Sequence, residues 1–181
     1  MRVISGSARG RRLKELPGMD TRPTTDQVKE SIFNIIQFDI EGRKVLDLFA
    51  GTGQMGIEAL SRGADHATFV DLAPAAAKIV RENVELTRFA GCAKVVQSDW
   101  RGFLSSCREK FDLIFLDPPY HTDMLENAMQ TIAAIDILSE HGIMICESPL
   151  DKELPELAAP YEKGKEYRYG KIKVTLYRRT V

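Results

Sequence analysis

Cysteine and histidine are scarce in this sequence, with three of each among 181 residues. They stand far apart along the chain, at Cys92, Cys107, Cys146, His66, His121 and His141. Metal sites and disulfide frameworks need paired or clustered ligands, and the sequence contains no Cys-x-x-Cys pair and no Cys/His cluster. We therefore expect no bound metal, and the odd number of cysteines favours free thiols in a cytosolic protein.

Long apolar runs are also missing. No stretch approaches the roughly 20 apolar residues that a membrane-spanning helix needs. The first residues, MRVISGSARGRR, are basic but lack the apolar stretch of a signal peptide. The length and the 44% hydrophobic and 28% charged residues fit one globular domain. The sequence thus predicts a cytoplasmic protein without membrane contact.

A net charge of -1 gives little sign of a nucleic-acid binder, but the charge is unevenly distributed. The first 14 residues hold Arg2, Arg9, Arg11, Arg12 and Lys14 and no acid, and residues 161–181 hold seven Lys or Arg and two Glu. Such charges are either solvated or gathered into a patch that binds phosphates. We take the four N-terminal arginines as candidate RNA contacts.

Short apolar runs alternate with helix-like stretches through the middle of the chain. We expect strands at residues 44–49, 67–71, 94–96, 111–116 and 143–146, and helices at residues 55–62, 74–86 and 124–135, with a short helix around Phe103. Strands that alternate with helices predict a parallel sheet with helices on both faces. The fold class is therefore α/β, in a doubly wound form.

Both ends of the chain depart from this alternation. Residues 161–169 and 171–178 flank Gly170, which predicts a terminal hairpin. The first 16 residues suggest a small hairpin around residues 6–10. Thr24 and Gln27 fit a capping box that opens a helix to about Ile36. We expect residues 1–40 to form a basic appendage and residues 41–181 the main domain.

A glycine-rich segment, Asp47-Leu48-Phe49-Ala50-Gly51-Thr52-Gly53, joins an expected strand to an expected helix. Ligands bind at the carboxyl ends of strands in such sheets. No lysine follows the glycines, which argues against a P-loop. A carboxylate at Asp47 would repel a pyrophosphate but suits a cationic ligand. S-adenosylmethionine carries an ammonium and a sulfonium and no phosphate, so we expect it here, on Asp47, Phe49, Gly51, Thr52 and Gly53.

Two further segments fit an adenosine site. Asp71 ends the second expected strand, where a carboxylate accepts the ribose hydroxyls, and Leu72 follows it. Asp99 and Trp100 follow the third strand and are candidates for holding the adenine, although Trp100 fits a core position equally well.

The strongest local signal is Asp117-Pro118-Pro119-Tyr120, directly after the fourth expected strand. Prolines fix φ and remove N–H donors. The Asp117 carboxylate and the Pro118 carbonyl can then accept both hydrogens of an exocyclic amine and aim its lone pair at a methyl donor. Tyr120 can stack on the base. These four residues are the expected catalytic group, since methyl transfer to a bound amine is mainly a positioning problem.

Several motifs together resemble the bacterial RsmD family of small-subunit (16S) ribosomal RNA guanine-N2 methyltransferases. They are Arg2-Val3-Ile4-Ser5-Gly6 with Gly10, Thr21-Arg22-Pro23-Thr24-Thr25-Asp26, the segment from Asp47 to Gly53, the stretch from Gly56 to Ala64, and Asp117-Pro118-Pro119-Tyr120. The resemblance covers nearly the whole chain. The last motif is shared with many DNA and RNA amino-methyltransferases, and the Arg-Pro-Thr segment and the basic head are more specific.

The resemblance implies a Rossmann-like, class I methyltransferase sheet of seven mostly parallel strands that ends in an antiparallel hairpin. It implies Arg22, Pro23 and Thr24 near the cofactor or target base, and ribosomal RNA as partner. Because so short a protein has few elements to unwind RNA, we expect that RNA to be in an assembling small subunit. One feature departs from the family pattern, because Leu72 and Ala73 follow Asp71 where a second acid is expected. The alternatives are a DNA adenine-N6 or cytosine-N4 methyltransferase and a non-catalytic RNA-binding assembly factor.

Overall fold

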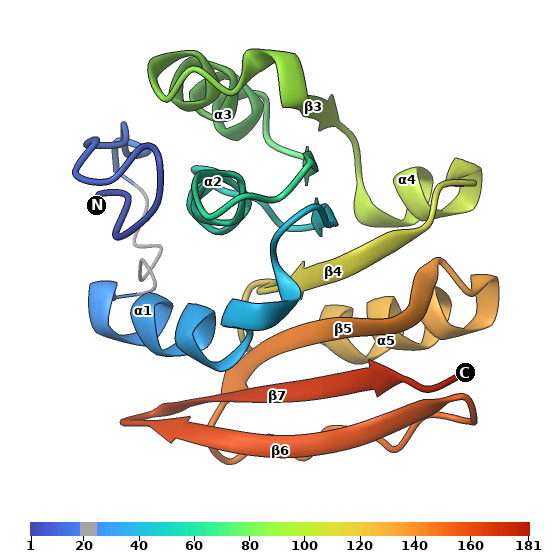
Figure 1. Ribbon diagram of the computed structural model, residues 1–181. Coiled ribbons are helices and arrows are strands. Elements are labelled where there is room, and N and C mark those ends of the chain that lie inside the picture. The colour runs from blue at the N-terminus through green and yellow to red at the C-terminus, as the bar shows by residue number, and fades with distance from the viewer. Residues whose placement is uncertain (19–24) are drawn as a thin grey trace.

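The computed structural model describes residues 1–18 and 25–181 and shows one mixed sheet flanked by helices (Figure 1). The strands are β1 Lys44–Asp47, β2 His66–Asp71, β3 Ala93–Gln97, β4 Phe111–Leu116, β5 Leu138–Pro149, β6 Tyr161–Tyr169 and β7 Ile172–Arg179. The helices are α1 Asp26–Ile35, α2 Gln54–Ser61, α3 Pro74–Leu86, α4 Trp100–Ser106 and α5 Met124–Ile135, with 3-10 turns η1 Gln37–Asp39 and η2 Ala90–Cys92.

The seven strands lie in the order β3-β2-β1-β4-β5-β7-β6. Strands β1 to β5 pair in parallel, whereas β7 is antiparallel to both of its neighbours, β5 and β6. The predicted seven-stranded, mostly parallel sheet with a C-terminal antiparallel hairpin is confirmed. The chain order reverses beside β1, so the carboxyl ends of β1, β2 and β4 meet at one edge, where such sheets bind ligands.

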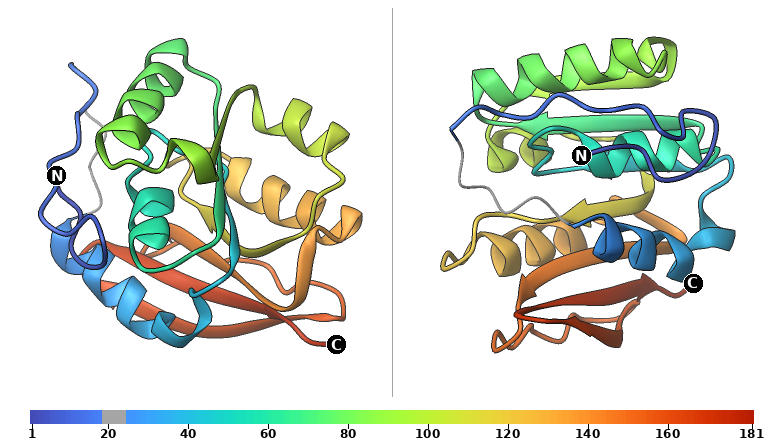
Figure 2. Two further views of the ribbon diagram at one scale, coloured as in Figure 1. Left: turned by 45° about the horizontal axis from the view of Figure 1, so that its top comes forward. Right: turned by 90° about the vertical axis from the view of Figure 1, so that its left-hand side faces the viewer.

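Alternate residues of the strands face opposite sides of the sheet and form two cores. One core packs Val45, Phe69 and Leu113 against α1, α2 and α3. The other packs Leu46, Val70 and Ile114 against α4 and α5. Figure 2 shows these two helix layers on the two faces of the sheet. This arrangement follows from parallel strands that are buried on both faces.

The N-terminal segment lies against α2 and α3 and shares the first core through Val3, Ala8 and Leu13 (Figure 2, right). Its two halves pair at an isolated bridge between Arg2 and Arg12, and the Val3 and Leu13 N–H groups also bond across, so the expected hairpin is present but short. The turn at residues 6–10 lies against the end of α2.

The ends of some helices and strands differ from those predicted from the sequence. Helix α1 is capped by Thr25, whose side chain accepts the Val28 N–H at 3.3 Å, rather than by a box based on Thr24. Strand β5 runs well beyond the expected residues 143–146, because Leu138 pairs with β4 and the strand pairs with β7 as far as Pro149. Strand partners far away in the sequence set the ends of β5, and local patterns do not show them.

Across residues 1–18 and 25–181, no helix is long and apolar enough to cross a membrane. The same residues contain no group of His, Cys, Asp or Glu side chains that could hold a metal ion. Cys146 is fully buried in the second core, and burial raises the pKa of its thiol well above the ordinary value.

Candidate active site

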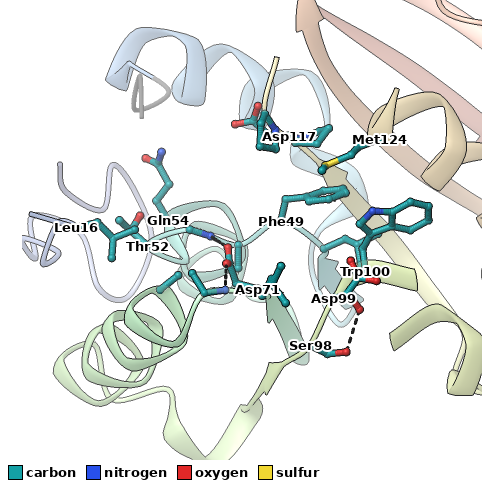
Figure 3. A pocket seen from close by; sticks show the side chains of 18 of the residues that line it. Leu16, Phe49, Thr52, Gln54, Asp71, Ser98, Asp99, Trp100, Asp117 and Met124 are labelled. Atoms are coloured by element: carbon teal, nitrogen blue, oxygen red, sulfur yellow. Dashed lines mark hydrogen bonds between the residues drawn. The ribbon is translucent and has the colours of Figure 1, made fainter. Parts of the chain in front are cut away.

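A cavity of about 760 Å³ opens at the carboxyl ends of β1, β2 and β4 (Figure 3). Its wall is made by Met1, Leu16, Leu48, Phe49, Ala50, Gly51, Thr52, Gln54, Asp71, Leu72, Ala73, Ala76, Ser98, Asp99, Trp100, Asp117, Pro118, Pro119, Tyr120 and Met124. Most of the wall is apolar, and a few polar groups converge on it, as is typical of small-molecule sites.

The glycine loop between β1 and α2 forms the floor of this cavity. Gly51 and Gly53 both have positive φ, at 57° and 81°. A side chain on Gly53 would press against Val80 at 3.2 Å, whereas the space beside Gly51 is open. Glycine at these positions therefore lets the backbone turn sharply and leaves room for a ligand.

Asp47 lies beneath the loop rather than in the cavity wall. It is 4% exposed, and its carboxylate accepts the Gly56 N–H at 3.1 Å. Burial, together with the nearby Asp71 charge and against the effect of that hydrogen bond, raises the pKa of Asp47 to about 7. The structure thus shows Asp47 fastening the loop to α2, and a direct contact with a cationic ligand stays a prediction.

Asp71 stands in the middle of the wall at the end of β2 (Figure 3). Its two oxygens accept the Gly51 N–H at 2.9 Å and the Ala73 N–H at 3.0 Å. A carboxylate has about four lone-pair positions, so these bonds leave acceptor capacity for two ribose hydroxyls. Leu72 is 66% exposed and lines the same cavity.

The segment after β3 forms one end of the cavity. Ser98 Oγ donates to the Asp99 carbonyl oxygen at 2.9 Å, and both residues line the wall. Trp100 is 5% exposed, belongs to the second core and also lines the cavity. The core interpretation of Trp100 is therefore confirmed, while a contact of its ring with adenine stays a prediction.

The Asp117-Pro118-Pro119-Tyr120 turn follows β4 and lies opposite the glycine loop. Tyr120 donates its hydroxyl to Glu147 Oε1 at 2.6 Å, which fixes the ring from β5. Because Leu116 pairs with Cys146 in register, Asp117 and Glu147 are neighbours across the two strands. Burial, then the charges of Glu147 and Asp47, raise the pKa of Asp117 well above its ordinary value.

The structure brings most of the predicted site residues into one wall. Phe49, Gly51, Thr52, Asp71, Leu72, Asp99 and Trp100 line it, with Asp117, Pro118, Pro119 and Tyr120. Asp47 and Gly53 lie just behind it. Several lining residues had no sequence signal, because distant segments deliver them, and these include Met1, Leu16 and Met124. Gln54 was detectable, since it directly follows the glycine loop.

The predicted RNA contacts lie elsewhere. Arg2, Arg9, Arg11 and Arg12 are exposed and outside the cavity wall, and Arg2 pairs with Asp26 at 3.2 Å. The neighbour of Arg9, Ala8, donates its N–H to Ser61 at the far end of α2, so Arg9 is remote from the cavity. Arg22 and Thr24 fall outside the described residues.

The wall fits the parts of S-adenosylmethionine in order. Ser98 and Asp99 offer polar atoms beside an aromatic ring at one end, as adenine requires, and Asp71 offers a carboxylate for the ribose. Thr52 and Gln54 offer polar atoms at the other end, for the amino acid.

Comparison with known proteins agrees with this geometry. A relative from Bacillus subtilis strain 168, named "Putative rRNA methyltransferase YlbH", is 41% identical over 99% of both chains. "Ribosomal RNA small subunit methyltransferase D" from Escherichia coli strain K12 is 33% identical over 99% of this chain and 90% of its own length. The solved structure "Putative methyltransferase yhhF from Escherichia coli" has a TM-score of 0.90 at 33% identity, covering 99% of this chain and 98% of that one.

A family model described as "Conserved hypothetical protein 95" matches residues 1–178, nearly the entire chain. The match spans the head, the glycine loop and the Asp-Pro-Pro-Tyr turn, which are the segments that carry the sequence resemblance. With this model match and these relatives, the chain belongs to that family, which is the RsmD family that its motifs resemble.

Proposed function

We propose that this protein transfers a methyl group from S-adenosylmethionine to the exocyclic N2 amine of a guanine in small-subunit ribosomal RNA. The proposal rests on one observation, that two groups of residues line the same cavity. Asp71 and Asp99 lie on one side of it, and Asp117 and Pro118 lie on the other. The names of the relatives support ribosomal RNA as the substrate, and the family resemblance supports guanine N2.

The chemical problem is that an exocyclic amine is a poor nucleophile, since its lone pair is delocalised into the ring. The Asp117 carboxylate and the Pro118 carbonyl accept its two hydrogens and favour a pyramidal nitrogen. Tyr120, tied to Glu147, supplies a face on which the base stacks. The fixed proline turn holds these acceptors in place before the substrate arrives, which is the main contribution to the rate.

S-adenosylmethionine, when bound, supplies an electrophilic methyl on its sulfonium. An amine that accepts this methyl group must lose one proton. Asp117 is placed to accept that proton. Its raised pKa makes it a better base than an exposed aspartate.

The target guanine must be unpaired or flipped out, because a paired amine cannot reach the cofactor. The head and the single α/β unit contain few elements that could open a helix. We propose that an assembled or partly assembled small subunit, where other proteins hold the loop open, is methylated faster than naked RNA.

Substitution of Asp117 tests the chemistry. Asp117→Ala removes an acceptor of the amine and leaves the cofactor end of the wall intact. We expect methyl transfer to purified small subunits to fall by about 100-fold or more, with S-adenosylhomocysteine affinity changed only a few-fold. Single-turnover transfer of a tritiated methyl group and calorimetry measure the two quantities. Near-normal turnover would show that Asp117 only ends the strand.

The target is tested in a deletion strain. Mass spectrometry of nucleosides should show the loss of one N2-methylguanosine from small-subunit ribosomal RNA. Persistence of that nucleoside with loss of N6-methyladenine or N4-methylcytosine from DNA would support a DNA methyltransferase instead. Cofactor binding without turnover on any nucleic acid would support a non-catalytic RNA-binding factor.

A further inference from the structure

Gln54 is the first residue of α2 and is a mostly buried polar residue in the cavity wall. Its side chain is 9% exposed, and its Oε1 atom is buried without a hydrogen-bond partner among the described residues. Figure 3 shows the side chain rising from the start of α2 toward the side of the cavity that holds Asp117. A residue that is nine-tenths buried therefore lines the ligand space, and its amide oxygen has no hydrogen-bond partner among the described residues.

Leaving a buried acceptor unpaired costs free energy, on the order of 1–3 kcal/mol. Most buried polar side-chain atoms in native proteins have a partner, so each exception calls for a physical explanation. Gln54 could be replaced by an apolar residue if it served packing alone. An unpaired amide oxygen on a residue of the cavity wall indicates a polar ligand group that completes its hydrogen bonds.

The position of Gln54 in the cavity limits which part of the ligand can form hydrogen bonds with its side chain. Ser98, Asp99 and Trp100 form the opposite end of the cavity, and Asp71 lies between the two ends (Figure 3). Adenine at the first end and ribose at Asp71 leave the amino-acid part of the cofactor beside Thr52 and Gln54. Asp47, the nearest buried carboxylate in the sequence, does not line the cavity and accepts from Gly56 instead.

We infer that Gln54 binds the amino-acid end of S-adenosylmethionine, with its amide oxygen accepting from the α-ammonium. This inference rests on the cofactor of the proposed function but not on its RNA target. An amide offers one acceptor and two donors, so it also suits the adjacent α-carboxylate. A half-turn of the terminal amide exchanges these roles, and both charged groups belong to the same end of the ligand.

Comparing S-adenosylhomocysteine with a ligand that lacks the amino-acid end isolates the contact between that end and Gln54. S-adenosylhomocysteine has the α-ammonium and α-carboxylate, whereas 5′-methylthioadenosine lacks both and keeps adenosine and sulfur. Gln54→Ala should weaken S-adenosylhomocysteine binding by about 10- to 100-fold, the usual range for a hydrogen bond to a charged group. The same substitution should leave 5′-methylthioadenosine binding within about two-fold. Calorimetry on the full chain without RNA measures both affinities.

A matched control lies at the other end of the cavity. Asp99→Ala should weaken both ligands by the same factor, since both carry adenine. Gln54→Met keeps the length of the side chain but removes its polar atoms, and it should repeat the result of Gln54→Ala. Circular dichroism and thermal unfolding of each variant show whether it is folded before its affinity is compared.

The outcomes separate this inference from the proposed function. If the unsubstituted protein binds neither ligand, the proposed cofactor is wrong. If it binds both ligands and the Gln54 variants weaken them equally or not at all, the assignment of Gln54 is overturned while the cofactor stands. A loss confined to S-adenosylhomocysteine supports the assignment.

Discussion

At the scale of single residues, Glu147 is the group that most affects the Asp117 turn. Its carboxylate accepts the Tyr120 hydroxyl at 2.6 Å, it is 8% exposed, and its charge is a cause of the raised pKa of Asp117. It stands on β5, about thirty positions along the chain from the turn that it supports. Sequence patterns gave no indication of it, because only the strand register makes it a neighbour of Asp117.

Glu147→Gln should shift the pH dependence of methyl transfer. The ionised form of Asp117 accepts the amine hydrogens, so activity falls as the pH drops below the pKa of Asp117. A neutral glutamine removes a nearby negative charge and lowers that pKa. We therefore expect the acid limb of the rate profile to move to lower pH. Single-turnover rates from about pH 5 to pH 9 measure the shift.

Tyr120→Phe is the control for this experiment. It removes the hydroxyl that Glu147 binds and keeps both the aromatic ring and the Glu147 charge. The loss should appear as a higher KM for the RNA, with the acid limb almost unchanged. An acid limb that stays in place in Glu147→Gln would show that the charge of Glu147 does not control Asp117.

At the scale of elements, a buried ion cluster fixes the N-terminal segment to two helices. Glu58 of α2 is fully buried and contacts Lys29 of α1 at 3.7 Å and Arg62 at 2.9 Å. Its carboxylate also accepts the N–H groups of Ile4 and Ser5 at 2.9 and 3.1 Å. One side chain thus holds together three segments that are far apart in the sequence.

Glu58→Ala should destabilise the fold strongly. It leaves the buried Lys29 ammonium without its carboxylate and two backbone N–H groups without an acceptor. Breaking a buried ion pair from one side typically costs about 3–5 kcal/mol. Urea unfolding followed by circular dichroism measures the free energy of unfolding.

Glu82→Ala is the matched control for this stability measurement. Glu82 of α3 also pairs with the N-terminal segment, through Lys14 at 2.8 Å, but the two side chains are 32% and 55% exposed, whereas those of Glu58 and Lys29 are fully buried. An exposed pair contributes little, so this variant should unfold almost like the unsubstituted protein. Equal effects of the two substitutions would contradict the role given to the buried cluster.

Some elements with local signals were predicted to the residue, whereas the ends of α2 and β1 differ from the expected ranges 55–62 and 44–49. Helix α3 begins at Pro74 and strand β4 spans Phe111–Leu116, both as expected from the pattern alone. The glycine loop and the proline turn were visible for the same reason, since each is a run of adjacent residues with special backbone requirements. The full length of β5 and the contributions of Leu16 and Met124 to the cavity depend on tertiary packing, which a local pattern does not encode.

At the scale of the whole molecule, the basic head is a structural part of the fold as well as a candidate RNA surface. Val3 and Leu13 are buried in the first core, and Leu16 lines the cavity. Asn83 of α3 accepts the Lys14 N–H at 2.7 Å and donates to the Thr52 carbonyl at 2.9 Å, so it links the head to the glycine loop. Deleting the head would therefore disturb folding and cofactor binding together.

Charge substitution separates the two roles of the head. Arg9, Arg11 and Arg12 are exposed, so replacing all three with glutamine removes charge without touching the core. If they contact phosphates, each lost contact lowers the slope of log K against log salt by about 0.7 to 0.9, and the triple variant lowers it by about two. Titrations of small-subunit RNA at several salt concentrations give the slope.

A second triple variant, Arg168→Gln, Lys171→Gln and Arg178→Gln, removes the same charge from exposed positions of the C-terminal hairpin. A slope that falls in the second variant and not in the first would move the RNA surface from the head to the hairpin.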